Sequence, residues 1–205
     1  GDTTSRSEAL KLLAFVVSME QGDGEFVNFV DAHGQLNLKA PSSRKSMSYW
    51  AARSIWAMGE ATRVLGPHDS ALIAPMRPTL DRAIARLGRD VDAGQLIGGS
   101  STATAEALLG VLALERAESS PDIAALATRT ATLLVRLSNG NPYTAPWGAR
   151  SETPSTEWHA WGSRSTEALA TAAQVLKRPD FAAAAKREAD GLWSRFIMAG
   201  QVASS

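Results

Sequence analysis

The sequence predicts an all-α protein made of two layers of helical hairpins, and three of its features carry that prediction. Apolar residues recur with the 3.6-residue period of an α-helix in seven segments. Short and long connections alternate between these segments, and so do amphipathic and almost fully apolar helices. The expected helices are Ser7–Met19, Lys45–Leu65, Pro78–Leu87, Thr102–Glu118, Asp122–Leu137, Ser163–Lys177 and Phe181–Ile197.

Taken in chain order, the expected helices differ in how their apolar residues are distributed. After the first two, residues 78–87 (PTLDRAIARL) place aliphatic side chains opposite charged ones, and so do residues 122–137 and 181–197. Residues 105–115 (AEALLGVLALE) and 166–176 (TEALATAAQVL) are apolar or small nearly all round. Because a helix that is apolar on all sides is buried on all sides, the alternation predicts an outer and an inner layer.

The connections support the same arrangement. The short ones contain GPHD, SSPD and RPD, in which Pro with Asp stops one helix and starts the next, with Asp as the expected N-cap. The long ones are rich in Gly, Pro and aromatic residues and cover residues 20–44, 88–101 and 138–162. A solenoid of helical pairs would share much of this pattern. The systematic length of every second connection favours a partial (α/α) toroid.

The composition limits the class of protein and its partners. With 205 residues, 44% hydrophobic residues and no net charge, the chain is expected to form one globular domain over residues 1–205. The balanced charge does not favour nucleic acid as a partner. No apolar run approaches the roughly 18 residues of a membrane span. The absence of Cys and the scattered positions of the His residues favour no metal site, and no nucleotide-binding motif points to a cofactor.

Two consecutive stretches carry a resemblance to a known family. GDGEFVNFVDAHGQL (22–36) followed by KSMSYWAARSIWAMGEATRVLG (45–66) resembles the six-hairpin glycosidase-like proteins, which fold as (α/α)6 toroids. It is most similar to toroid domains of bacterial sugar-handling and glycosyltransferase-associated proteins. These often carry an aromatic-Asn-aromatic loop before a helix with an aliphatic-Trp-Ala-x-Gly stretch, here Ile55 to Gly59. The resemblance implies a carbohydrate-active domain, hydrolase-like in ancestry, whose cleft lies at the N-terminal ends of the inner helices.

The number of helices departs from that family. Six hairpins need about twice as many helices as the seven expected here, so the chain is expected to be about half of a toroid, a fragment, or one part of an assembly. An open end would expose apolar helix faces, which usually find a partner. Besides a carbohydrate ligand, the expected partners are therefore a second copy of the chain or the remainder of the toroid.

The first long connection is expected to contain a small β-hairpin near residues 25–39. EFVNFV and QLNLKA lie on either side of DAHG, and Gly34 suits the left-handed position of a turn. In a strand, Glu25 and Asp31 would share one face and Asn28 would lie on the other. Glu25 and Asn28 are candidate substrate-binding residues. The alternative is that Asp31 is a turn residue bonding its own backbone.

The third long connection contains a second group of candidates, in NPYTAPWGARSETPSTEWHAWGSR (141–164). Sugars have apolar CH faces and polar edges, so their sites combine flat aromatic rings with carboxylates and amides. The candidate substrate-binding residues here are Tyr143, Trp147, Trp158 and His159. The alternative is that the aromatic residues pack over the end of a helical barrel.

Hydrolysis of a glycosidic bond normally needs two carboxyl groups, one as general acid and one as base or nucleophile. The expected pair is Asp31 with Glu157, since each neighbours aromatic residues in a separate long connection. Glu106 and Glu167 lie near the starts of inner helices, where the helix dipole favours a carboxylate, and were interpreted as structural. A non-catalytic helical domain that binds a glycan or a protein remains the alternative function.

Overall fold

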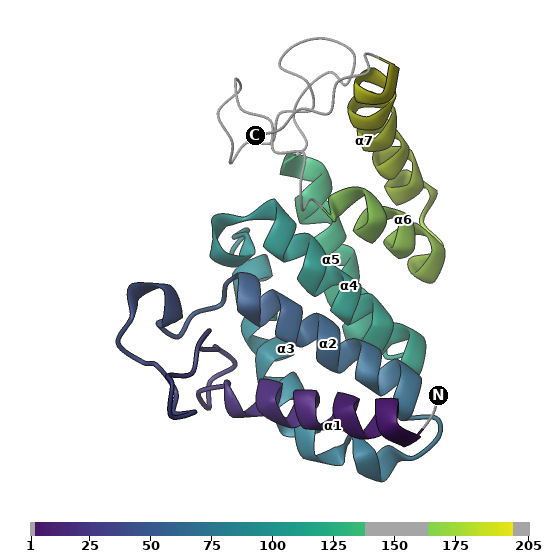
Figure 1. The fold of residues 1–205 in the computed structure, drawn as a ribbon. Coiled ribbons are helices and arrows are strands. Elements are labelled where there is room, and N and C mark those ends of the chain that lie inside the picture. Colours follow the sequence, from purple (N-terminus) through teal and green to yellow (C-terminus); the bar gives the residue numbers. More distant parts are fainter. Residues whose placement is uncertain (1–2, 138–163, 199–205) are drawn as a thin grey trace.

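The computed structural model describes residues 3–137 and 164–198 of the chain. Within these residues the protein is helical and no β-strand forms. The α-helices are α1 (Thr3–Ser18), α2 (Tyr49–Leu65), α3 (Arg77–Asp92), α4 (Ser101–Glu118), α5 (Pro121–Leu137), α6 (Ser165–Leu176) and α7 (Pro179–Met198) (Figure 1). All seven expected helices are therefore confirmed, with shifted ends. None of these helices combines the length and apolarity needed to span a bilayer.

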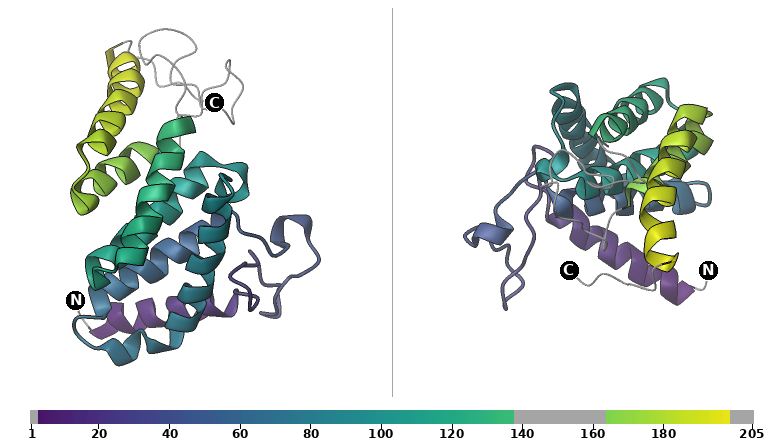
Figure 2. Two further views of the ribbon diagram at one scale, coloured as in Figure 1. Left: turned by 180° about the vertical axis from the view of Figure 1, so that it is seen from behind. Right: turned by 90° about the horizontal axis from the view of Figure 1, so that it is seen from above.

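The helices pack in two layers, as the alternation of amphipathic and apolar segments predicted. Helices α2, α4 and α6 lie side by side in that order and form the inner layer. Helices α3, α5 and α7 each pack against the inner helix that precedes them, and α1 lies along α2. Helix α1 is at one end of the molecule and α7 at the other (Figures 1 and 2). The fold is thus a row of helical hairpins.

Helix α4 is the centre of the core, because every residue from 103 to 114 is buried. Its closest neighbour is α2, and glycines on both helices allow the approach. A Cβ atom added to Gly59 of α2 would lie only 2.2 Å from the carbonyl oxygen of Gly110 in α4. The absence of a side chain at both positions therefore lets the two backbones come into contact.

The short connections differ in one detail from the prediction that Asp caps the following helix. Asp69 does cap a helix, but the helix is the 3-10 turn Ser70–Leu72. Asp122 and Asp180 lie inside the first turns of α5 and α7, because each helix begins one residue earlier at a proline. Proline suits a first helical position, where its missing N–H would have no partner in any case.

The β-hairpin expected near residues 25–39 does not form. The described residues contain only isolated bridges there, with Val30 opposite Leu36 in antiparallel pairing. Gly34 does adopt a left-handed conformation, with φ +76°, so the turn between them is present. A single bridge gives no alternation of faces, and the prediction of a strand was wrong.

The reason lies at the start of this loop, where neighbouring side chains are both buried. Phe26 is 0% exposed and Val27 is 2% exposed, which a strand with a side-chain period of 2 and one buried face does not allow. Phe26 exchanges backbone hydrogen bonds with Ser46, and Val27 N–H donates to the Met19 carbonyl at 3.0 Å. The Trp50 indole N–H donates to the Phe26 carbonyl at 2.9 Å. These contacts with several segments hold the loop, which projects from one side of the helical body (Figure 2).

Candidate functional site

A buried carboxylate links the first two helices of the inner layer. Glu106 of α4 is 3% exposed and, counted over the whole residue, is the one charged residue that is buried in the described part of the chain. The side chain of Glu20 is buried to a similar degree. It accepts hydrogen bonds from the Tyr49 hydroxyl at 3.0 Å and from Nε of Arg53 at 3.2 Å. Arg53 also donates from Nη2 to the Tyr49 oxygen at 3.1 Å. A buried charge is stable only with such partners, so Glu106 depends on both α2 residues.

The local sequence explains how α2 presents this pair. Tyr49 and Arg53 are four residues apart at the start of the helix, so they share one face. The Arg53 guanidinium lies 4.4 Å from the centroid of the Tyr49 ring, a cation–π contact that orders the side chain. The Arg53 side chain is nevertheless 63% exposed, which connects the buried Glu106 carboxylate to a surface open to solvent.

The same contacts stabilise the charged form of Arg53. Partial burial alone would lower the pKa of Arg53. The Glu106 carboxylate and the Tyr49 hydroxyl outweigh that effect and raise the pKa of Arg53 above its ordinary value. The guanidinium therefore remains charged at neutral pH.

The third inner helix adds a second arginine to this surface. Arg164, directly before α6, lies with its guanidinium 5.1 Å from the centroid of the Trp56 ring of α2. It donates from Nη1 to Glu167 at 2.7 Å, and this bond is the main reason that the pKa of Arg164 is raised. Side chains of α2 and α6 therefore meet across α4. We call Tyr49, Arg53, Trp56, Glu106 and Arg164 the inner-layer cluster.

The cluster marks one end of the inner layer. Tyr49, Arg53 and Glu106 lie within the first two turns of their helices, and Arg164 immediately precedes the third. At the opposite end, residues 115, 116 and 119 and residues 174 and 175, from the ends of α4 and α6, line one shared depression. The inner helices are therefore parallel. The long connections enter them at the end that carries the cluster.

The loop before α2 is tied to the outer layer by a second ion pair. The Glu20 side chain is 3% exposed and accepts from Nη2 of Arg82 in α3 at 2.5 Å, and from the Gly24 N–H at 2.7 Å. Burial alone would raise the pKa of Glu20, but these hydrogen bonds outweigh it and lower the pKa below its ordinary value. The loop is thus anchored where it leaves α1.

The structure places Asp31, one of the two expected catalytic residues, at the exposed tip of this loop. Its Oδ1 accepts from the backbone N–H of His33 at 2.8 Å and from that of Gln35 at 2.9 Å. These are the bonds of a turn residue, which the sequence left open as the alternative. Its other carboxylate oxygen has no hydrogen bond among the described residues.

Two expected substrate-binding residues also lie in this loop. Glu25 is half-buried and forms an ion pair with Arg86 of α3, at 3.1 Å from Nε. The Asn28 side-chain amide donates to the Ser42 carbonyl at 3.3 Å. Both side chains hold the loop to its surroundings, and the contacts of neither reach the inner-layer cluster.

The remaining candidates from the sequence lie outside the described residues and stay predictions. They are Tyr143, Trp147, Glu157, Trp158 and His159. Among the described residues, no group of three or more His, Asp and Glu side chains could hold a metal ion.

Sequence reasoning interpreted Glu106 as structural and missed its partners Tyr49 and Arg53. Two signals were present: a single acid within the apolar residues 103–114, and an aromatic residue four positions before an arginine at the start of another helix. A carboxylate in a buried helix requires a cationic or hydroxyl partner. The sequence could have predicted that Glu106 has such a partner, but it could not have identified the partner as Arg53.

Comparison with models of known protein families and with the curated proteins finds no match to this chain.

Proposed function

We propose that this chain is part of an (α/α) toroid that binds an oligosaccharide or polysaccharide at the N-terminal ends of its inner helices. The observation that carries the proposal is the buried Glu106 with Tyr49 and Arg53, at the end of the inner layer where the long connections enter. Burying a charge in a helical core is unfavourable unless an opposite charge and hydrogen bonds compensate it, as Arg53 and Tyr49 do for Glu106.

The chemistry of the cluster suits a sugar. Tyr49 and Trp56 supply aromatic surfaces for the apolar faces of a pyranose ring, and the arginines supply N–H donors for its oxygen atoms. Ligand sites typically combine aromatic walls with a few fixed polar groups, and the side chains here are fixed by their mutual contacts. The proposed substrate-binding residues of the third long connection would complete the cleft: Tyr143, Trp147, Trp158 and His159.

Hydrolysis of glycosidic bonds in the cleft would require a pair of carboxyl groups in addition to Glu106. Asp31 and Glu157 remain our candidates for the general acid and the base. Their carboxyl groups would have to lie about 5–5.5 Å apart for retention or roughly 6.5–9.5 Å apart for inversion. A domain that binds the glycan without cleaving it is the alternative within the same proposal.

Isothermal titration calorimetry with a panel of oligosaccharides, alongside an assay for release of reducing ends, tests the proposal. We expect the wild type to bind, and Tyr49→Phe to bind about tenfold more weakly because one hydroxyl that orders Glu106 and Arg53 is gone. Arg63→Ala, on the same helix but outside the cluster, is the matched control. If no saccharide binds, the proposal is wrong; binding without turnover would support the non-catalytic alternative.

Asp31→Asn and Glu157→Gln test the catalytic role separately. Loss of turnover with retained binding is expected if the pair is catalytic. If turnover by both variants equals that of the wild type, the assignment of this pair is wrong, although binding at the inner-layer cluster stands.

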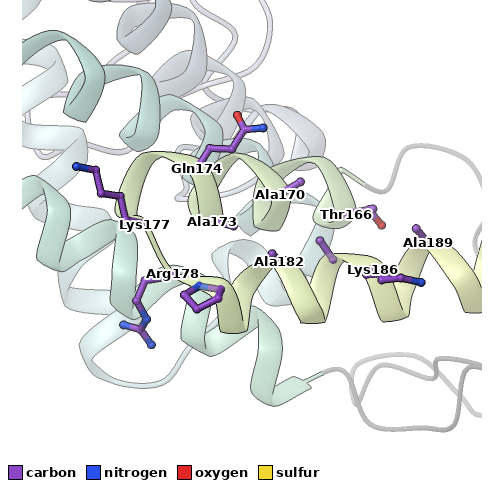
Figure 3. Close-up of a pocket in the computed structure, with 11 residues that line it drawn as sticks. Thr166, Ala170, Ala173, Gln174, Lys177, Arg178, Ala182, Lys186 and Ala189 are labelled. Carbon is purple, nitrogen blue, oxygen red and sulfur yellow. The ribbon is translucent and has the colours of Figure 1, made fainter.

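A second candidate function, binding of a helical partner, is favoured by a groove between α6 and α7 (Figure 3). Its volume is about 610 Å³, and alanine side chains make up much of its lining. They are Ala170, Ala173, Ala182, Ala185 and Ala189. A groove of small side chains beside the last inner helix is where a further inner helix would pack. Light scattering would show whether a second copy occupies it: a dimer that Ala173→Trp converts to a monomer supports this, and a wild-type monomer rules out the second copy.

A further inference from the structure

We infer that the ligand of the inner-layer cluster is an acidic saccharide, and that Arg53 and Arg164 bind its carboxylate groups. This inference rests on the proposed carbohydrate function and deepens it by naming the class of sugar. It is drawn from the hydrogen-bonding capacity, the exposure and the ordering of the two guanidinium groups.

Among the described residues, both arginines retain N–H donors that are not bonded to a protein partner. A guanidinium group has five N–H donors. Arg53 uses Nε towards Glu106 and Nη2 towards Tyr49, and Arg164 uses Nη1 towards Glu167. Each arginine therefore contacts a carboxylate through a single nitrogen in the described residues, although an arginine and a carboxylate favour two parallel bonds. The N–H groups that remain can donate hydrogen bonds to a carboxylate of the ligand.

The two guanidinium groups are accessible and held in place. The side chains of Arg53 and Arg164 are 63% and 46% exposed. Each lies over an aromatic ring, Tyr49 for Arg53 and Trp56 for Arg164, which limits the rotamers that a long side chain samples. An ordered planar group loses less entropy on binding than a free one, which favours recognition of a flat carboxylate.

The arrangement across α4 suits a chain of acidic sugars better than a single small anion. Arg53 projects from α2 and Arg164 precedes α6, with Glu106 of α4 between them within the electrostatic reach of both. Two guanidinium groups that come from different segments can bind the carboxylates of two sugar units in one chain, which a single small anion does not provide. Uronate residues combine a carboxylate with the CH faces of a sugar ring.

Matched acidic and neutral ligands test the inference. Oligogalacturonates and oligomannuronates are titrated as free acids and as methyl esters, so that the sugar chain is unchanged and only the charge differs. We expect the free acid of at least one chain to bind about tenfold or more tightly than its ester, with an affinity that falls as salt is added. We expect Arg164→Ala to lower the affinity for the acid about 10- to 100-fold and to leave binding of the ester nearly unchanged.

Two further variants separate a loss of recognition from a loss of folding. Arg53→Lys keeps a cation beside Glu106 but cannot form the bidentate contact, so we expect weaker binding of the acid at an unchanged melting temperature. Arg63→Ala removes another exposed arginine of α2, which is paired with Glu60, and should bind as the wild type does. If esters or neutral saccharides bind as tightly as the acids, the inference is overturned and the proposed function stands. If no saccharide binds, both are overturned.

Discussion

Replacing Gly59 with alanine tests how close α2 and α4 must lie for the inner layer to hold the cluster. The added Cβ would lie 2.2 Å from the carbonyl oxygen of Gly110 and 2.9 Å from its carbonyl carbon, whereas ordinary contacts begin near 3.4 Å. The obstructing atoms belong to the backbone, so no side chain can rotate away. The two helices therefore have to separate by about 1 Å, in the most buried part of the protein.

Two opposing effects decide the size of the change. Alanine favours a helix over glycine by about 1 kcal/mol, which stabilises the variant. Overpacking of a well-filled core destabilises by about 1–3 kcal/mol and occasionally more, and a clash between two backbones belongs at the upper end. The net expectation is a loss of about 2 kcal/mol. For a chain of this size that lowers the melting temperature by roughly 4–8 °C.

Gly88→Ala in α3 is the matched control, since an added Cβ there meets no atom within 4 Å. The helix preference then acts alone, and we expect Gly88→Ala to be more stable than the wild type by about 0.5–1 kcal/mol. Thermal unfolding followed by circular dichroism measures both variants. The reasoning is refuted if Gly59→Ala melts at or above the temperature of the wild type while Gly88→Ala behaves as expected.

Three further predictions each concern a substitution at one residue. Glu20→Gln should destabilise by about 1–3 kcal/mol, measured by urea unfolding, because Arg82 loses its charged partner. Since the folded-state pKa of Glu20 is lowered, its contribution is complete above the ordinary value of 4.5 and is lost as the pH falls through the folded-state value. Ser165→Ala should raise the free energy of unfolding by about 1 kcal/mol, measured by urea unfolding. The reason is that the buried Oγ has no hydrogen-bond partner in the described part of the chain. Glu106→Gln should weaken saccharide binding, measured by calorimetry, because Arg53 is no longer held by a carboxylate.

Each of these three predictions would be contradicted by a specific result. A difference in stability between the wild type and Glu20→Gln that persists unchanged in acid would show that the ion pair is not its source. A less stable Ser165→Ala would show that the hydroxyl has a partner in solution. If Glu106→Gln binds the saccharide as tightly as the wild type, the Glu106 carboxylate does not contribute to binding. Glu60→Gln on the exposed face of α2 is the control.

The helices and their layers could be predicted from the sequence because both depend on residues close together in the chain. The period of apolar residues locates a helix, and the width of its apolar face indicates how many neighbours cover it. Residues 105–115 were expected to be buried on all sides for this reason, and all of them but Glu115 are buried. The same expectation was wrong for residues 166–176, of which only Ala168, Leu169 and Ala172 are buried. The turn at Gly34 was equally local, since glycine readily adopts a positive φ.

The first long connection shows where local patterns stop being sufficient. Its alternating apolar residues predicted a strand, but Phe26 and Val27 are both buried because Met19, Ser46 and Trp50 surround that point of the loop. Those contacts come from the end of α1 and from the start of α2. A local pattern of alternation carries no information about neighbours that approach from several directions.

By itself, the sequence determined that this protein is built from alternating outer and inner helices. The expected alternation of short and long connections was wrong at one place, because residues 66–76 between α2 and α3 form a longer connection than residues 93–100 between α3 and α4. Only the tertiary structure decided that Tyr49 and Arg53 meet Glu106, which lies 53 residues beyond Arg53 in the chain. The axial alignment of α2 and α4 brings them together, and that alignment depends on the contact between Gly59 and Gly110. The period of apolar residues is a property of one helix. The alignment between two helices depends instead on how their surfaces pack. A carboxylate remains charged in a core only where that packing supplies its partners.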